Sequence, residues 1–307
     1  MLKKLKLLLR LARIHFLIPG FMLYLMGHLL ALLGGVEYDL TKFVFGYLIF
    51  GTAHLSVSFS NDYFDRKSDR NSIKTVFSGG SKVLVKHPDL ETLALRSAVI
   101  LLCISVVANA IFTIVYSYPF WFFIFGLIGG LVGWFYTAPP IKLAYRGLGE
   151  LSTMLAVGLL MPGMGFFVAS GNIGWLFQMF ILPLSCYGLF FIITVELPDF
   201  ESDVQNQKKN FLVKWGINTG RNICVAAAIT GTLLMIMILF SEITETIDMR
   251  SLVLFSIMPL IASISGLLID IGKRRLLVRQ VTTNMASLIG FLLLTDVSLF
   301  TQLLLKL

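Results

Sequence analysis

Charged residues are scarce in this chain. They make up 14% of its 307 residues, whereas hydrophobic residues make up 57% and the mean hydropathy is +0.85. Because about a quarter of the residues in a typical soluble domain are charged, this composition excludes an ordinary soluble protein. It is typical of a protein that crosses a membrane several times.

Cysteine is also rare. The three cysteines, Cys103, Cys186 and Cys224, fall inside apolar stretches without paired spacing or a nearby histidine. Disulfide frameworks and cysteine-bound metal sites need paired or regularly spaced ligands, so we expect packing roles for all three. Short-period repeats, low-complexity tracts and a soluble second domain are not evident either. We therefore expect residues 1–307 to form one integral-membrane domain.

Long apolar runs, by contrast, fill the chain. A helix that crosses the hydrocarbon layer needs about 20 predominantly apolar residues. Nine segments satisfy this requirement: 13–34, 43–60, 94–116, 119–138, 148–170, 174–195, 222–241, 251–271 and 285–305. The runs are continuous and lack the alternation of a membrane barrel. The predicted fold class is therefore an all-α, polytopic membrane protein with nine transmembrane helices.

Basic residues gather on one side of this predicted topology. Of the 25 lysines and arginines, 22 fall at the N-terminus or in loops after even-numbered spans, and three, Lys42, Arg250 and Lys306, fall on the other side. Positive residues are retained in the cytoplasm. The pattern predicts a protein of the inner or plasma membrane whose N-terminus is cytoplasmic and whose C-terminus lies on the other side. It also explains the positive net charge, so we expect no nucleic-acid partner.

The first twelve residues combine basic and apolar side chains. We interpret residues 1–12 as an amphipathic lead-in that lies on the anionic cytoplasmic surface and contacts membrane lipids. The alternative is that this segment only sets the orientation of the first span. No small-residue cleavage site of a signal peptide follows it.

The first of two long cytoplasmic loops, 61–93, begins with an acidic cluster directly after a span. Asn61, Asp65 and Asp69 are spaced by four, so they share one face if the helix continues. Asp62 falls about 100° away and is a secondary candidate. These side chains are therefore candidates for one binding site.

The second loop, 196–221, begins in the same way. Asp199 and Asp203 are four residues apart, and Glu196 lies three residues before Asp199, so a helix would again place all three on one side. Like charges at this spacing repel one another. We therefore expect a positive group between them.

These oxygen ligands favour one kind of site. Carboxylate and amide oxygens suit Mg²⁺, which commonly bridges carboxylates to the phosphates of a substrate. Each cluster alone could be a solvated helix end, but two clusters on the same membrane face favour a shared site. The sequence therefore predicts a phosphate-bearing substrate held by magnesium between two acidic walls.

Such a substrate also needs cations, and two cytoplasmic segments between the acidic clusters supply them. Gly79 and Gly80 permit close backbone approach to an anion, and Lys82 follows directly. Lys142 and Arg146 belong to the second segment and are suited to diphosphate oxygens. The alternative is that these basic residues only determine topology.

The motifs resemble those of a known family. NDYFDRKSD is similar to the first aspartate-rich motif of the UbiA superfamily of intramembrane prenyltransferases, and DFESD is similar to the second. GGSKVL and YTAPPIKLAYRGLGE resemble the versions in the MenA-like branch, which prenylates 1,4-dihydroxy-2-naphthoate. The resemblance implies a helical bundle around a central cavity, two Mg²⁺ ions, a polyprenyl diphosphate donor and an aromatic acceptor.

The resemblance also implies roles for individual residues. The catalytic aspartates would bind the metal ions, with Asn61, Asp65 and Asp69 at one ion and Asp199 and Asp203 at the other. Tyr136 and Lys142 would lie near the diphosphate. Glu196 departs from the pattern, because many relatives carry aspartate or asparagine at that position.

Several alternatives stay open at this point. His54 lies seven residues before Asn61 and either contacts the acceptor or bonds to a neighbouring helix. A terpene cyclase on the same scaffold would need identical metal motifs, and a prenyltransferase could use another acceptor such as 4-hydroxybenzoate or a glyceryl lipid. A transporter predicts acids at mid-membrane and related halves, which the sequence does not display. A catalytically silent isoprenoid-binding scaffold would not need the intact motifs.

Overall fold

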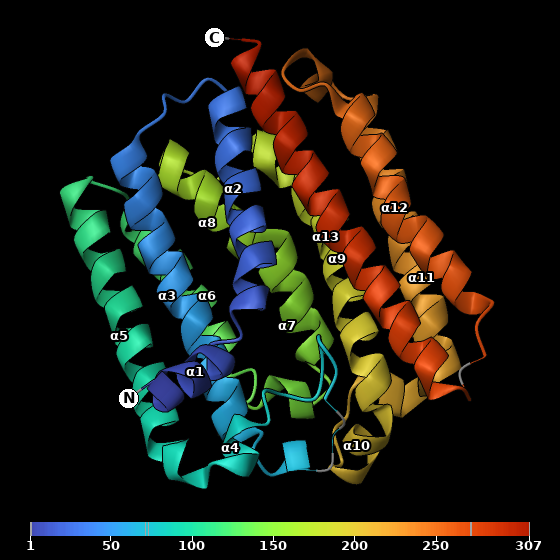
Figure 1. Cartoon of the computed structure of the whole chain (residues 1–307). Coiled ribbons are helices and arrows are strands. Elements are labelled where there is room, and N and C mark those ends of the chain that lie inside the picture. The colour runs from blue at the N-terminus through green and yellow to red at the C-terminus, as the bar shows by residue number, and fades with distance from the viewer. Residues whose placement is uncertain (1, 71, 73, 271, 307) are drawn as a thin grey trace.

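The structure, a computed structural model, is a bundle of long helices (Figure 1). It describes residues 2–70, 72, 74–270 and 272–306, and these contain no β-strand. The bundle helices are α2 (Leu17–Leu33), α3 (Leu40–Phe64), α5 (Glu91–Val115), α6 (Phe120–Trp134), α7 (Gly149–Leu155), α8 (Met161–Ser170), α9 (Trp175–Glu196), α11 (Phe211–Leu239), α12 (Met249–Leu267) and α13 (Arg274–Leu304). The short elements are α1 (Leu2–Leu11), η1 (Ile14–Phe16), η2 (Ser68–Arg70), α4 (Val83–Lys86), η3 (Pro88–Leu90), η4 (Leu143–Tyr145), η6 (Leu197–Asp199), α10 (Phe200–Gln205) and η7 (Glu242–Glu245), and a π-helix, η5 (Ala156–Leu160), joins α7 to α8.

The helices confirm the predicted all-α membrane fold. In the described residues, eight helical segments are long and apolar enough to cross a membrane, and α6 is a shorter apolar helix at the predicted fourth span. α11 and α13 begin 11 residues before the predicted starts at 222 and 285. The apolar run marks only where a helix enters the hydrocarbon layer. In α13 the polar turns before that point continue the same helix, whereas in α11 a kink at Gly216, with φ 83° and ψ 161°, separates the first turns from the rest.

One end of the bundle carries most of the short elements. Figure 1 shows the N-terminus, α1, α4 and α10 at this end and the C-terminus at the opposite end. α1 lies across the end of the bundle, and its last residue Leu11 and the following Ala12 are buried with Phe59 and Leu84 in one apolar cluster. The predicted lead-in is therefore packed against the loop that follows the first acidic motif.

The backbones of α2 and α8 touch where the two helices cross. A Cβ atom on Gly27 would collide with the carbonyl oxygen of Pro162, and one on Gly165 would collide with the carbonyl oxygen of Tyr24. Only glycine permits such a close approach. The crossing fixes α2, which follows directly after the N-terminal segment, to the helix that forms one wall of the cavity described below.

The π-helix between α7 and α8 forms part of this wall. π turns are rare and are frequent at functional sites. Ala156, Val157 and Leu160 of the π-helix all face the cavity. Gly158, on another side of the turn, packs tightly against Ser185 of α9. The irregular turn thus presents apolar side chains to the cavity while it stays anchored to the bundle.

Candidate active site

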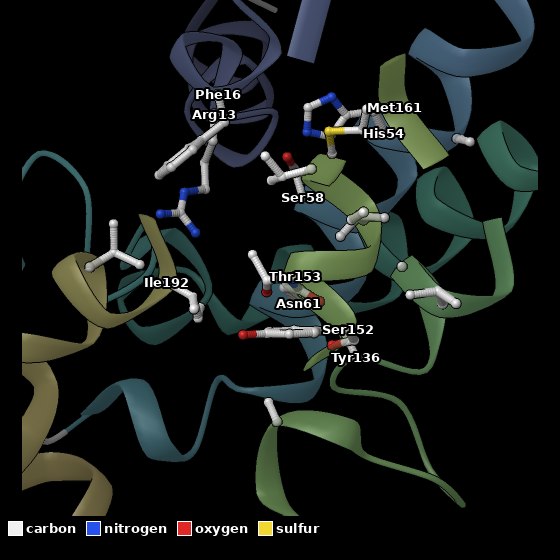
Figure 2. A pocket seen from close by; sticks show the side chains of 18 of the residues that line it. Arg13, Phe16, His54, Ser58, Asn61, Tyr136, Ser152, Thr153, Met161 and Ile192 are labelled. Atoms are coloured by element: carbon white, nitrogen blue, oxygen red, sulfur yellow. The ribbon is translucent and has the colours of Figure 1, made fainter. Parts of the chain in front are cut away.

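A cavity of about 350 Å³ lies between α3, α6, the π-helix and α9 (Figure 2). Both acidic motifs line it, together with an apolar interior. The polar lining residues include Asn61, Asp62, Asp65, Asp69, Glu196, Asp199, Asp203 and Lys208, and the apolar ones include Ile49, Phe125, Val132, Leu160 and Met164. The cavity therefore has a charged end and an oily body.

A stripe on one face of α3 runs along the cavity. Ile49, Ala53, Val57 and Asn61 recur every four residues, Asp65 continues the series directly after the helix, and all five line the cavity. The stripe winds gradually around the helix, because each step of four turns by about 40°. At a rise of 1.5 Å per residue, this face extends about 24 Å from the first of these residues to the last. The face changes from apolar to acidic at the helix end, which connects the oily body of the cavity to its charged end.

The first acidic motif is held by hydrogen bonds from neighbouring elements. Thr137 Oγ1 donates to Asn61 Oδ1 at 2.8 Å, and Tyr145 Oη donates to Asp65 Oδ1 at 2.7 Å. The Asp65 and Asp69 amides continue the helical pattern beyond the end of α3, because each bonds the carbonyl oxygen four residues earlier. All three motif residues consequently face the cavity, as their spacing predicts.

Asp62 holds the loop that contains the glycine pair. Its buried carboxylate accepts hydrogen bonds from the backbone amide and the hydroxyl of Ser81. Each of its two oxygens accepts one of these bonds, so the carboxylate is committed to this loop. It orders the segment directly after the glycines.

The glycine pair connects the two acidic motifs. The Gly79 amide donates to Asp199 Oδ2 at 3.1 Å. Gly80 has a positive φ of 63°, and a Cβ atom there would collide with the Asp69 carboxylate. The close approach to an anion that the sequence predicts is therefore made to the protein's own carboxylates, and it brings together motifs that are 130 residues apart in the chain.

Lys208 lies between the acids of the two motifs. Its Nζ is 2.9 Å from Asp203 Oδ1 and lies over the Tyr145 ring at 5.3 Å, and Asn210 donates to the other oxygen of Asp203. Burial alone would lower the pKa of Lys208, but the nearby carboxylates of Asp65 and Asp203 raise it well above its usual value. The lysine is therefore a fixed positive charge, of the kind that the repulsion between the acids requires.

Arg13 contributes a second cation from the N-terminal segment. It has a left-handed backbone conformation, with φ 45°, directly before η1. Figure 2 shows its guanidinium extending into the cavity beside Phe16, whose ring centroid is 4.4 Å away. The ion pairs of the described residues are Arg66–Glu91 and Lys208–Asp203, so Arg13 is free to bind an anion. Sequence reasoning missed it, because an arginine before a first span reads as a topology determinant.

The three predicted substrate cations lie beside the cavity. The described residues that line the cavity do not include Lys82, Lys142 or Arg146. The ammonium of Lys82 donates to the backbone carbonyl oxygen of Asp69, and the guanidinium of Arg146 donates to the carbonyl oxygen of Pro140 at 2.8 Å. Both bonds order the loops around the charged end of the cavity.

The remaining predicted residues do line the cavity. Burial and the nearby Glu196 carboxylate raise the pKa of Tyr136, so its phenol stays protonated and can donate a hydrogen bond. Glu196 has one buried oxygen without a partner among the described residues. His54 lies beside Met161 in Figure 2, and its buried Nδ1 makes no hydrogen bond to any described residue, so the alternative of a bond to a neighbouring helix does not hold for this atom.

The donor chemistry of the charged end fits Mg²⁺. Asp199 Oδ1 is buried without a hydrogen-bond partner in the described chain, and burial together with the neighbouring Asp65 carboxylate raises the pKa of Asp69 to about 7. Crowded carboxylates of this kind are stabilised by a cation. In the described residues, however, no three His, Cys, Asp or Glu side chains converge on one point, and Lys208 lies between the motifs.

Comparisons with known proteins agree with this architecture. A 1,4-dihydroxy-2-naphthoate octaprenyltransferase of Bacillus subtilis is 25% identical over 209 residues, which cover 67% of this chain and 65% of the relative, or slightly less than two thirds of its length. Two solved structures share the fold. A UbiA homologue from Archaeoglobus fulgidus bound to GPP and Mg²⁺ has a TM-score of 0.63 at 17% identity and covers 95% of this chain and 99% of its own. An apo UbiA homologue from Aeropyrum pernix has a TM-score of 0.65 at 12% identity and covers 94% and 97%.

The sequence also matches a protein family over most of its length. The match to the UbiA prenyltransferase family spans residues 20–288, which contain both acidic motifs and the helices that line the cavity. The motif resemblance, the fold and this match lead to one assignment. The chain belongs to the UbiA prenyltransferase family.

Proposed function

We propose that this protein transfers a prenyl group from a polyprenyl diphosphate to an aromatic acceptor, 1,4-dihydroxy-2-naphthoate, in menaquinone biosynthesis. The observation that carries the proposal is the single cavity with two acidic motifs at one end and an apolar body. A polyprenyl diphosphate has the same division into a charged head and an oily tail. The name of the Bacillus subtilis relative supports this choice of acceptor.

The reaction depends on Mg²⁺ in this proposal. Asn61, Asp65 and Asp69, which line the cavity, would hold one ion, and Asp199 and Asp203 would hold the other. When bound, the metal neutralises the negative charge that develops on the departing diphosphate. The Mg²⁺ in the structure of the archaeal homologue supports the choice of ion.

The chain's own donors bind the diphosphate next to the acids. Arg13 and Lys208 supply positive charge inside the cavity, and the protonated Tyr136 phenol supplies a hydrogen bond. Lys82, Lys142 and Arg146 lie in the surrounding loops and do not line the cavity; in this proposal they add positive charge around its charged end. These contacts orient the head group, so that the bond between the allylic carbon and the diphosphate oxygen lies at the border of the apolar body.

The apolar body protects the allylic cation that forms when this bond breaks. Leu160, Met164 and Phe125 exclude water, which would otherwise capture the cation. The acceptor ring attacks the cation, a carbon–carbon bond forms, and the ring loses a proton; on the route to menaquinone the ring carboxylate must also leave, as carbon dioxide. His54, which lines the same cavity, contacts the acceptor in this proposal.

Product analysis tests this proposal directly. The purified protein in lipid nanodiscs is given geranylgeranyl diphosphate, 1,4-dihydroxy-2-naphthoate and Mg²⁺, and the products are identified by mass. A prenylated naphthoate, or the prenylated ring that has lost carbon dioxide, supports the proposal, and EDTA should abolish its formation. A cyclised hydrocarbon that forms without acceptor would instead support a terpene cyclase. Panels with 4-hydroxybenzoate and a glyceryl lipid separate the other acceptors.

A pair of variants in the second motif distinguishes a metal role from a structural one. Asp199→Ala should remove turnover, because this carboxylate lines the cavity and has a free oxygen. Glu201→Ala is the matched control, since Glu201 lies two residues away in α10 and is exposed. Equal activity in Asp199→Ala and wild type would contradict the proposed role of the motif.

The location of the protein follows from the same reasoning. We infer that it lies in the cell membrane with the charged end of the cavity on the cytoplasmic side, because the basic loops gather at that end. The donor tail then remains in the membrane interior while its head group meets water-borne Mg²⁺. Labelling of single introduced cysteines in intact cells tests this orientation.

A further inference from the structure

One face of α6 forms a wall of the cavity. Phe125, Gly129 and Val132 of α6, and Tyr136 two residues beyond its end, follow one another at helical spacing and line the cavity. Gly126, Gly130 and Gly133 line it as well. Tyr136 marks the charged end, since its phenol lies close to Glu196. Gly129 is seven residues deeper, which corresponds to about 10 Å along the helix. This wall therefore leads from the head-group region into the apolar body.

The glycines of α6 differ in what surrounds them. A Cβ atom on Gly126 would collide with the Asn109 side chain, and one on Gly133 would collide with Val57. At Gly130 the nearest atom, from Leu102, is 3.1 Å away. These three glycines allow α6 to pack closely against α3 and α5.

Gly129 has no such packing partner. A Cβ atom built there meets no atom of the described residues within 4 Å, although the residue lies inside a helix and on the cavity wall. Glycine destabilises a helix interior by up to about 1 kcal/mol relative to alanine. Its presence at a position with free space is therefore not explained by helix stability or by helix packing, and the free space it borders is the cavity.

The wall around this position is apolar. α6 packs against α3, α5 and the π-helix, which contribute Ile49 and Leu160 to the cavity lining. Ser105 of α5 also lines the cavity, but its hydroxyl donates to the Ile49 carbonyl oxygen at 2.7 Å. An uncharged hydrocarbon chain fits this lining better than a polar acceptor does.

We propose that Gly129 sets the bore of the channel that holds the isoprenoid tail, and that it thereby determines the length of prenyl donor that the enzyme accepts. This inference rests on the proposed prenyltransferase function. A side chain at this position would project into the channel without disturbing the helix contacts. It would exclude tails that extend beyond about 10 Å from the head group and leave shorter tails unaffected.

The test compares donors of different length on Gly129→Ala and Gly129→Leu. The donors are dimethylallyl, geranyl and geranylgeranyl diphosphate, each with the same acceptor and Mg²⁺, and kcat/KM is measured for each. The dimethylallyl group is too short to reach Gly129. An inserted side chain that overlaps a longer tail should lower the geranylgeranyl-to-dimethylallyl ratio of kcat/KM about tenfold or more in the leucine variant, with the alanine variant intermediate.

A matched control uses another glycine in a membrane helix. Gly51 of α3 lies outside the cavity lining and has only Tyr47 near a built Cβ atom, at 3.5 Å. Gly51→Leu should leave the ratio unchanged. If wild type converts no donor, the proposed function fails. If wild type is active but the Gly129 variants keep the wild-type ratio, or lose activity equally on all three donors, the inference about Gly129 is overturned.

Discussion

Replacing Lys208 by methionine is expected to destabilise the metal-free protein and to make its stability strongly dependent on Mg²⁺. The ammonium is 2.9 Å from Asp203 Oδ1, and its side chain is 19% exposed while that of Asp203 is 4% exposed. The ammonium of Lys208 also lies near the Asp65 carboxylate. Methionine keeps the stem of the lysine and removes the charge, so the acids of the two motifs would repel one another without compensation.

The size of the effect follows from this geometry. Removing one partner of a buried ion pair costs about 3–5 kcal/mol, and the partial exposure of Lys208 argues for the lower end, about 3 kcal/mol. Asn210 and Tyr145 still donate to Asp203 and Asp65, which limits the loss further. A bound divalent cation would replace the missing charge. Saturating Mg²⁺ adds about 2.7 kcal/mol at 100 times its Kd, so it should restore most of the lost stability.

The assay is thermal unfolding of the purified protein in detergent, with and without Mg²⁺. Lys208→Met should have a lower Tm than wild type in EDTA and a larger upward shift on addition of Mg²⁺. Lys209→Met is the matched control, because the neighbouring lysine is exposed, and it should behave like wild type in both conditions. A Lys208→Met variant with the wild-type Tm in EDTA, or with an equal Mg²⁺ shift, would refute the reasoning.

Three further substitutions test other parts of the site. Arg13→Gln should raise KM for the donor about tenfold, because a charge-assisted hydrogen bond to the diphosphate is lost; an unchanged donor KM would exclude that contact. His54→Phe should raise KM for the acceptor and leave KM for the donor unchanged, as measured by steady-state kinetics, and the reverse pattern would contradict an acceptor role. Glu150→Ala should lower Tm by removing the buried carboxylate that accepts the Phe211 amide at the start of α11; the expected loss is about 1–2 kcal/mol, and an unchanged Tm would show that this bond is not needed.

Hydropathy and spacing predict much of this molecule because both are local properties. An apolar run long enough to span a membrane identifies a helix wherever it packs, so the helical fold follows from the sequence. A spacing of four residues places Asn61, Asp65 and Asp69 on one face without any tertiary information. The prediction is less exact at α6, whose 15 residues fall short of a full span.

Long-range placement could not be predicted in the same way. Arg13 and Lys208 look like ordinary cytoplasmic basic residues, and only the fold brings both to the cavity wall. Lys208 and Lys209 are adjacent in the sequence, yet one is paired with Asp203 and the other is exposed. The glycine pair also illustrates the limit, because sequence alone predicts an anion partner for Gly79 but not that this anion is Asp199.

The crossing of α2 and α8 has a consequence for how substrates enter. Two backbones in direct contact cannot slide or separate slightly, since any shift at Gly27 or Gly165 would cause a clash or leave a void. These two helices therefore move as one rigid pair. A motion that admits a lipid-sized molecule must take place in the helices around this pair, so spectroscopic labels that detect the motion should be placed on those helices.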